Sequence, residues 1–308
     1  MAVPDFAGGI HTVSAPVSPR RARDKSGRDL MPYVGTKDWI FWQTRASDLE
    51  AAGGDGWRDE LVFDFPKPAG ANKARLVFNG CTTLWGSQMI KRVLDLQGRT
   101  VGDWYRDVNA LGPSLFKTIA WDAREELYRL RLRVETERGW TSKGMIMGGG
   151  PLVSEDRVYD FDISDAKGDV LRIKLTPPAS FWMINWLAVD YGEDSSCQVT
   201  ELAPLAAVDG RGRDVRNQLT LEDGSYLVMP NFGDRAEVTF LAPPARPDSL
   251  RSVYVRASGY YDIHLDATAE LPTETLRRVA EEPGYVLKFS AEQYAKAQKE
   301  IHERGRKR

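Results

Sequence analysis

Histidine and cysteine are scarce in this chain. Its 308 residues include only three histidines and two cysteines, Cys81 and Cys197. This scarcity excludes an H-E-x-x-H metalloprotease motif, a Cys₂His₂ zinc site and a c-type haem motif. Two cysteines also cannot build a disulfide framework, and we expect two buried thiols rather than a bonded pair. These residue types therefore point to no metal or haem chemistry.

The chain also lacks a long apolar run and a large net charge. No run approaches the ~18 residues that a membrane-spanning helix needs. Residues 1–6 do not show the basic segment and apolar segment of a secretory signal. We therefore expect a cytoplasmic protein, with a mature exported domain as the alternative. A net charge of −2 argues against a nucleic-acid partner, and 42% apolar residues indicate an ordinary globular protein.

One short motif occurs twice. Residues 24–29 and 209–214 both read D-x-x-G-R-D, and Asp38 recurs as Asp223. The positions differ by the same amount, since 209 minus 24 and 223 minus 38 both give 185. Further matches pair residues 62–65 with 237–240 and residues 76–78 with 253–255. This pattern predicts an internally repeated β unit, with Asp24 and Asp209 at equivalent turns.

Alternation of apolar and charged residues predicts strands. In residues 128–135 the apolar side chains fall on one face and three arginines on the other, and residues 158–163 and 171–175 repeat the pattern. Residues 181–189 are almost all apolar, which predicts a central strand covered on both faces. We therefore predict a mainly β protein, an antiparallel β-sandwich of jelly-roll type. Its core should include Leu130, Leu132, Phe161, Ile173 and Ile184.

The chain should divide into four segments. We expect an irregular arm at 1–21, a β-sandwich at 22–195, a second β unit at 196–270 and a helical basic tail at 271–308. Within these segments, residues 84–96 show helical spacing, residues 99–125 show no clear pattern, and residues 253–265 resemble a strand. The S-x-x-Q sequence that starts at Ser290 predicts that the last helix begins there.

The repeated turns are candidates for calcium binding. Carboxylates spaced around a glycine resemble part of a calcium loop, and the residues concerned are Asp24, Asp29, Asp209 and Asp214. The motif lacks the remaining ligands and the closing glutamate of an EF-hand. Aspartate and glycine also form tight turns without any metal, and we favour that interpretation. We expect no other cofactor.

Aromatic residues near turns suggest a ligand surface. The chain has nine tryptophans, and most of them should lie in the core. An exposed ring can stack on a sugar face or anchor a protein partner. The candidates for such a surface are Trp39, Trp42, Trp85 and Trp104.

Other patterns favour structural roles over chemistry. Arg129, Arg131 and Arg133 form an outward basic stripe, which we expect to pair with Asp160 and Asp162 on adjacent strands. We expect His264 to be a half-buried strand residue, because no G-x-S-x-G motif accompanies it. The glycines at 148–150 lack the G-K-[ST] of a phosphate loop. We therefore predict no catalytic residues.

Basic clusters lie at both ends of the chain. The first comprises Arg20, Arg21 and Arg23, and the second comprises Arg304, Arg306 and Arg308 beside a helical stripe that includes Tyr294 and Ile301. Such ends suit an acidic protein partner or an anionic membrane face. We expect removal of residues 290–308 to leave the β core folded and to weaken assembly.

Residues 233–261 resemble a known module. The segments 233–240 and 251–261, with their Gly-Asp-Arg and Val-Tyr-Val-Arg runs, are similar to the β-rich C-terminal module of bacterial FG-GAP/UnbV-type and TPR-containing proteins. The resemblance implies a bacterial, non-catalytic β module. It carries no binding residue over to this chain, because the calcium repeats of the FG-GAP proteins are not visible here.

These observations favour a non-enzymatic binding or assembly subunit. In this interpretation the β-sandwich is an accessory protein that docks through its ends on a larger complex or an anionic membrane face. A carbohydrate-binding module with surface tryptophans is the first alternative, and a β-sandwich hydrolase with buried carboxylates is the second.

Overall fold

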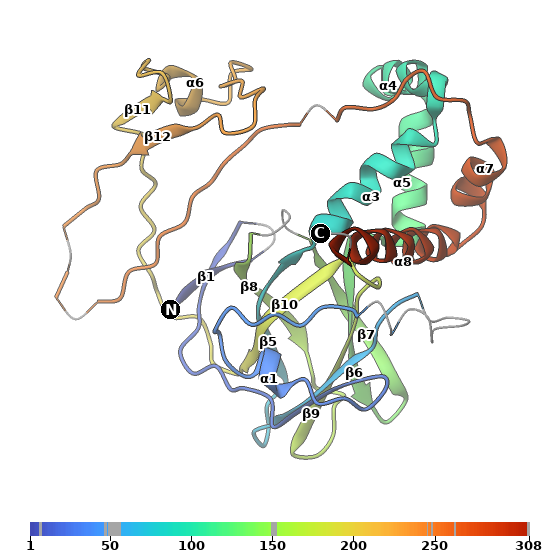
Figure 1. Ribbon diagram of the computed structural model, residues 1–308. Coiled ribbons are helices and arrows are strands. Elements are labelled where there is room, and N and C mark those ends of the chain that lie inside the picture. The colour runs from blue at the N-terminus through green and yellow to red at the C-terminus, as the bar shows by residue number, and fades with distance from the viewer. Residues whose placement is uncertain are drawn as a thin grey trace. The chain divides into compact units, whose positions relative to one another are not determined.

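The computed structural model divides the chain into two compact units (Figure 1). Residues 3–194 and 263–308 form the sandwich unit, and residues 1–2 and 195–262 form the second unit. The residues that the structure describes are 1–5, 8–45, 48, 57–148, 153–244, 246–247, 249–261 and 263–306, with the backbone alone at 302 and 304–306.

The larger sheet of the sandwich unit has five antiparallel strands. In spatial order they are β3 (Arg21–Asp24), β4 (Leu61–Pro66), β9 (Val170–Thr176), β6 (Arg129–Thr136) and β7 (Gly139–Met147). The strands alternate between buried and more exposed positions, because successive side chains in a strand point to opposite faces. One face of this sheet is therefore buried, and the other meets solvent.

A three-stranded sheet packs against the first one. Its order is β10 (Trp182–Asp190), β5 (Lys73–Thr82) and β8 (Glu155–Asp162), again antiparallel. The chain crosses between the two sheets after β4, β5, β7, β8 and β9. This alternate filling of two sheets is the jelly-roll arrangement, so the predicted mainly β, antiparallel sandwich is confirmed.

The core lies between the two sheets. Leu130, Leu132, Ile173 and Ile184 are fully buried and Phe161 is 6% exposed, and all five belong to one apolar cluster, as predicted. Strand β10 is covered on both faces, as its apolar run predicted. It lies at the edge of its sheet rather than in the centre, and single bridges to Val17 and Trp42 cover its outer edge.

The N-terminal arm is more regular than its sequence predicts. It contains β1 (Ala2–Pro4) and β2 (Ile10–Thr12), which pair with each other. Val3 and Val13 are buried in a cluster with residues of β5, β8 and β10, on the outer face of the three-stranded sheet. Strands of three residues are too short to produce a recognisable alternation, and for that reason the sequence suggested an irregular segment.

Helices occupy the long connection between β5 and β6, and further helices form the C-terminal segment. They gather beside the sandwich in Figure 1. Their bounds are α3 (Leu84–Asp95), the 3-10 turn η1 (Gly98–Thr100), α4 (Val101–Asn109), α5 (Pro113–Glu125), α7 (Thr273–Glu281) and α8 (Tyr285–Arg306). A further short helix, α1 (Met31–Val34), follows β3. The helix predicted near 84–96 is confirmed, whereas residues 99–125 form helices that the sequence did not reveal.

The last helix begins earlier than its sequence suggests. It starts at Tyr285, so Ser290 lies inside the helix and not at its N-terminus. Ser290 is buried, and its hydroxyl accepts a hydrogen bond of 3.2 Å from the indole Nε1 of Trp85. The S-x-x-Q sequence is therefore not a capping box here, because the serine hydroxyl serves a contact between helices.

The second unit contains little regular structure. It has a two-stranded antiparallel sheet of β11 (Ala206–Asp209) and β12 (Ala236–Thr239), and a single helical turn, α6 (Asn217–Thr220). The strand predicted at 253–265 is not present in the described residues of that stretch. A strand is defined by pairing with a neighbouring strand, and the described residues of this stretch take part in no strand pairing.

Candidate functional site

The first D-x-x-G-R-D turn is built around one carboxylate. Asp24 Oδ1 accepts hydrogen bonds from the backbone N–H groups of Ser26 (2.9 Å) and Arg28 (3.0 Å). Gly27 has a φ of +83°, which the turn requires and which glycine adopts without strain. These hydrogen bonds, together with the Arg28 guanidinium, outweigh the effect of partial burial and hold the pKa of Asp24 below its usual value.

The second turn has the same construction. Asp209 Oδ1 accepts from the N–H groups of Arg211 and Arg213, both at 2.9 Å, and Gly212 has a φ of +79°. The last aspartate of each motif accepts a hydrogen bond from the backbone N–H two residues further on, Asp29 from Met31 and Asp214 from Arg216. All four aspartates predicted as metal ligands are thus engaged in backbone turns. Among the described residues, no three acidic, histidine or cysteine side chains are grouped to hold a metal ion.

The strand pairing that flanks each turn also repeats. Ala22 pairs with Phe63 in β3 and β4, and Ala207 pairs with Val238 in β11 and β12. The sequence match aligns Ala22 with Ala207 and Phe63 with Val238. The two copies therefore share their strand pairing as well as their turn motif. The third matched segment does not correspond, because residues 76–78 lie in β5 whereas residues 253–255 form no strand.

The two copies differ in what surrounds them. In the first copy, β4 has β3 on one edge and β9 on the other, and the side chains of Leu61, Phe63 and Phe65 are fully buried. In the second copy, β12 has β11 on one edge and no described strand on the other. Ala236 and Val238 are half-buried and Phe240 is 42% exposed. The second copy is thus the same hairpin without its cover.

Large apolar side chains are exposed throughout the second unit. Phe232, Leu250 and Tyr261 are each more than nine-tenths exposed, and Val253 and Val255 are each about four-fifths exposed. Others in the same unit are Leu221, Val228, Leu241 and Tyr260. Isolated exposed apolar residues are normal on a protein surface, and the number of them within this one unit is its distinguishing feature.

The four candidate tryptophans do not form one platform. Trp42 and Trp85 are buried in the main core, and Trp104 packs edge-on against Tyr105 with ring centroids 5.0 Å apart. Trp39 is 69% exposed and has a φ of +68°, an unusual backbone conformation for a bulky residue. Of the four, Trp39 is the one that presents an open ring.

A chain of polar contacts holds Trp39 in place. Its backbone N–H donates to Oδ1 of the fully buried Asn185 at 2.9 Å. Asn185 in turn donates to Asn79, and Asn79 donates to Asp156, both at 2.8 Å. Lys37 forms an ion pair with Asp156 at 2.7 Å. The backbone of this exposed tryptophan is thus tied to a network of amide, carboxylate and ammonium groups, and its ring lies 6.3 Å from that of Phe41 between centroids.

A hollow lies on the solvent-facing side of the five-stranded sheet. It encloses about 460 Å³, and its lining is Arg23, Asp24, Lys25, Gly27, Val62, Glu135, Trp140, Arg172 and Lys174. Its cations are largely engaged, since Arg172 pairs with Asp64 at 2.8 Å and Lys174 with Glu60 at 2.9 Å. The Lys174 ammonium also lies 4.4 Å from the centre of the Trp140 ring, so it covers one face of that indole.

The arginine stripe on the same face has partners other than those predicted. Arg129 pairs with Asp122 at the end of α5, and Arg131 pairs with Glu126 just after it. Asp160 and Asp162 lie on β8 in the other sheet, so the expected pairing is wrong. The sequence pattern showed which face the arginines occupy but not which strands are their neighbours.

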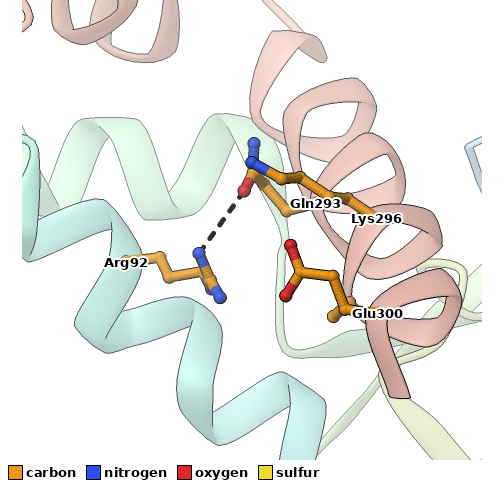
Figure 2. Close-up of a pocket in the computed structure, with 5 residues that line it drawn as sticks. Arg92, Gln293, Lys296 and Glu300 are labelled. Atoms are coloured by element: carbon orange, nitrogen blue, oxygen red, sulfur yellow. Dashed lines mark hydrogen bonds between the residues drawn. The ribbon is translucent and has the colours of Figure 1, made fainter. Parts of the chain in front are cut away.

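A small polar pocket lies between α3 and α8. Figure 2 shows Arg92 from α3 facing Gln293, Lys296 and Glu300 from α8, in a space of about 200 Å³. Arg92 Nη1 donates to Gln293 Oε1 at 3.4 Å. The lining is polar apart from Ala297. The pocket is a small polar space at the crossing of two helices.

The residues predicted to bind a partner at the two ends of the chain differ in how far they are exposed. Tyr294 packs edge-on against Trp85 of the same chain at 5.3 Å, whereas Ile301 is 63% exposed. Arg20 and Arg21 are exposed and Arg23 is half-buried on β3. The side chains of Arg304 and Arg306, and all of Arg308, lie outside the described residues.

The predicted chemistry of histidine and cysteine needs correction in two places. His264 is exposed and lies outside any strand, so the prediction of a half-buried strand residue is wrong. Cys81 is buried, as expected, but Cys197 is exposed, and the two form no disulfide.

Among the described residues, no helix combines the length and apolar character that crossing a bilayer requires.

Comparison with known proteins gives little further information. No protein-family model and no curated protein matches the chain. One solved structure with some likeness is a xylan-binding module, CBM15, which is 11% identical and is matched over 60% of this chain and 99% of its own length. The TM-score is 0.30, and at that value the likeness bears on neither the fold nor the function of this chain.

Proposed function

We propose that this protein is a non-catalytic binding subunit that docks on a protein partner through the second unit, residues 195–262. The observation that supports this most directly is the exposure of large apolar side chains in that unit, with Phe232, Leu250 and Tyr261 as the extreme cases. Burying such side chains is favourable by about 1.5–3 kcal/mol each, so a surface of this kind gains stability from a partner.

The second unit has little regular structure to stabilise it. The sheet formed by its described residues has two strands, and an isolated two-stranded sheet is at best marginally stable in water. Residues 233–261, which resemble the β-rich module of bacterial FG-GAP/UnbV-type and TPR-containing proteins, lie inside this unit. We propose that this stretch is an interaction module.

The ends of the chain are less suited to docking than their composition suggested. Val3 and Val13 of the arm are buried on the three-stranded sheet. Val286 of α8 is buried in the main core, and Ala291 is buried in a small cluster with Ala179. Because both ends are used within the sandwich unit, we assign docking to residues 195–262 and leave the basic ends as secondary contacts.

The test compares two forms of the chain in extracts of its source cells. One is the full-length protein, and the other has residues 195–262 replaced by a Gly-Ser linker. We expect the full-length protein to elute from size exclusion in a larger complex that survives high salt, because apolar contacts are not screened. The shortened form should elute alone. If both forms elute in the same complex, the proposal is wrong.

Carbohydrate binding at Trp39 is a second candidate function. Its support is an exposed indole on a residue with a strained backbone conformation, whose backbone N–H is held by the buried Asn185. Strain of this kind is often retained at functional sites. In affinity electrophoresis through gels containing soluble polysaccharides, Trp39→Ala should abolish any retardation and Trp104→Ala should not. Equal retardation of the two variants would exclude Trp39 as the platform.

A further inference from the structure

We propose that β12 accepts an antiparallel β-strand from the partner protein at its open edge, and that this strand carries apolar side chains at alternate positions. This inference rests on the proposed function, because it specifies how the second unit docks. The first copy of the internal repeat has a strand at the position that is open in the second copy.

In the first copy, β9 covers the edge of β4. The register pairs Leu61 with Leu175, Phe63 with Ile173 and Phe65 with Leu171. Two bonds beyond the strand ends follow the same register, from Asp59 N to Pro177 O at 2.9 Å and from Lys67 N to Asp169 O at 2.7 Å. Backbone groups alternate between the two edges of a strand, so the N–H and C=O of Phe63 face β9.

The second copy presents the same groups to an open edge. Gly210 N donates to Arg235 O at 2.9 Å, so alternate residues starting at Arg235 face β11. Ala236, Val238 and Phe240 therefore direct their backbone groups to the opposite edge. Both copies also share a bond at the strand start, from Arg20 N to Asp64 O and from Leu205 N to Thr239 O, each 2.8 Å. Val238 is thus the structural equivalent of Phe63.

The missing strand is not supplied by the remaining apolar stretch of this unit. Residues 253–255 form no strand, and β11 is the one strand that pairs with β12 among the described residues. The position beside β12 requires a strand from elsewhere, and the first copy indicates its chemistry: aliphatic residues at every second position, as at Leu171, Ile173 and Leu175.

A single backbone change tests this inference. Val238→Pro removes the outward N–H and leaves the bonds between β11 and β12, because proline is tolerated where the N–H of an edge strand faces solvent. Val238→Thr is the matched control, since it keeps the N–H and a similar shape. Retained hydrogen-exchange protection in β11 will show that the hairpin of each variant is intact.

The probe is a labelled synthetic peptide with the sequence of residues 168–177, which contains β9. We expect saturable binding to the full-length protein by fluorescence anisotropy. Loss of one backbone hydrogen bond should weaken binding by about tenfold in Val238→Pro, and binding to Val238→Thr should stay within about twofold. A peptide with serine in place of Leu171, Ile173 and Leu175 should not bind.

Three results would overturn the inference. They are equal binding of the peptide by the proline and threonine variants, no binding by the wild-type protein, and hydrogen-exchange protection of the Val238 amide in the isolated monomer. The last would mean that the edge is already covered within the chain. If Val238→Pro stays in the native complex that the shortened form loses, strand addition is wrong and the proposed function stands. If the shortened form also stays in the complex, both are wrong.

Discussion

His11 contacts two carboxylates, one at each ring nitrogen. Nε2 lies 3.1 Å from Asp5, and Nδ1 lies 2.7 Å from Asp194. Arg75 pairs with Asp194 at 2.6 Å and with Asp190 at 3.0 Å. Partial burial lowers the pKa of His11, but its hydrogen bonds to Asp194 and Asp5 outweigh this effect and raise the pKa above 6.5. This cluster links the N-terminal arm to Asp190, the last residue of β10, and to Asp194 just after it.

The stability of the sandwich unit should therefore depend on pH. A histidine with a raised folded-state pKa contributes stability that is fully present below its unfolded pKa and is lost as pH rises through its folded pKa. We expect the free energy of unfolding to fall by about 1 kcal/mol or less between about pH 6 and pH 8, because the pairs are partly exposed. Urea titrations should show this slope in the wild-type protein and not in His11→Gln. An identical slope in both proteins would contradict the assignment.

Leu132 tests the packing between the sheets. It is fully buried on β6, between neighbours from β9 and the opposite sheet. Leu132→Ala removes three carbon atoms from a closed core and should lower the free energy of unfolding by about 2–5 kcal/mol. Chemical denaturation gives the value directly. A change below about 0.5 kcal/mol would mean that the site is not packed as described.

The C-terminal helix is an integral part of the helical layer. The N–H of Gly284 donates to Glu125 Oε2 at 2.9 Å, and Trp121 Nε1 donates to Val279 O at 2.8 Å. Val286 is fully buried, and Ala291 is 2% exposed. Helices α7 and α8 thus close over α3 and α5, although more than 140 residues separate them from α5 in the chain.

This arrangement reverses an expectation from the sequence. Removal of residues 290–308 exposes Trp85, deletes the buried Ser290 and Ala291, and cuts α8 near its first quarter. We expect the truncated protein to lose several kcal/mol of stability and to melt at a lower temperature, because a buried aromatic contact and its hydrogen bond disappear. Circular dichroism melts will measure the effect. A melt identical to that of the full-length protein would show that this helix is a dispensable tail.

The two compact units should respond differently to deletion. The main apolar cluster contains residues between 22 and 191 and between 276 and 297, and no described residue from 195–262. Replacing residues 195–262 with a Gly-Ser linker should therefore leave the melting temperature of the sandwich unit within about 2–4 °C, which corresponds to about 1 kcal/mol for a domain of this size. Differential scanning calorimetry provides the test. A protein that fails to fold would show that residues 195–262 contribute to the core.

Local sequence patterns were sufficient for the alternating strands of the sandwich and for the repeated turns, but not for the short strands of the arm or for residues 253–265. Alternation at Leu130 and Leu132 identifies the buried face because a strand has a period of two residues. The D-x-x-G-R-D motif is equally readable, because Asp24 and Gly27 act on backbone groups within four residues. Interactions of such short range are present in the sequence itself.

Tertiary contacts decided the rest. Whether Trp85 lies in a core or on a surface depends on α8, some 200 residues away in sequence, which also converts Ser290 from a supposed helix cap into a buried partner. Likewise, the partners of Arg129 and Arg131 depend on which strands are neighbours. The two copies of the repeat share their local sequence signals, yet β4 is covered by β9 and β12 is open. Burial and pairing depend on what the remainder of the chain places beside a segment, and local sequence carries no information on that.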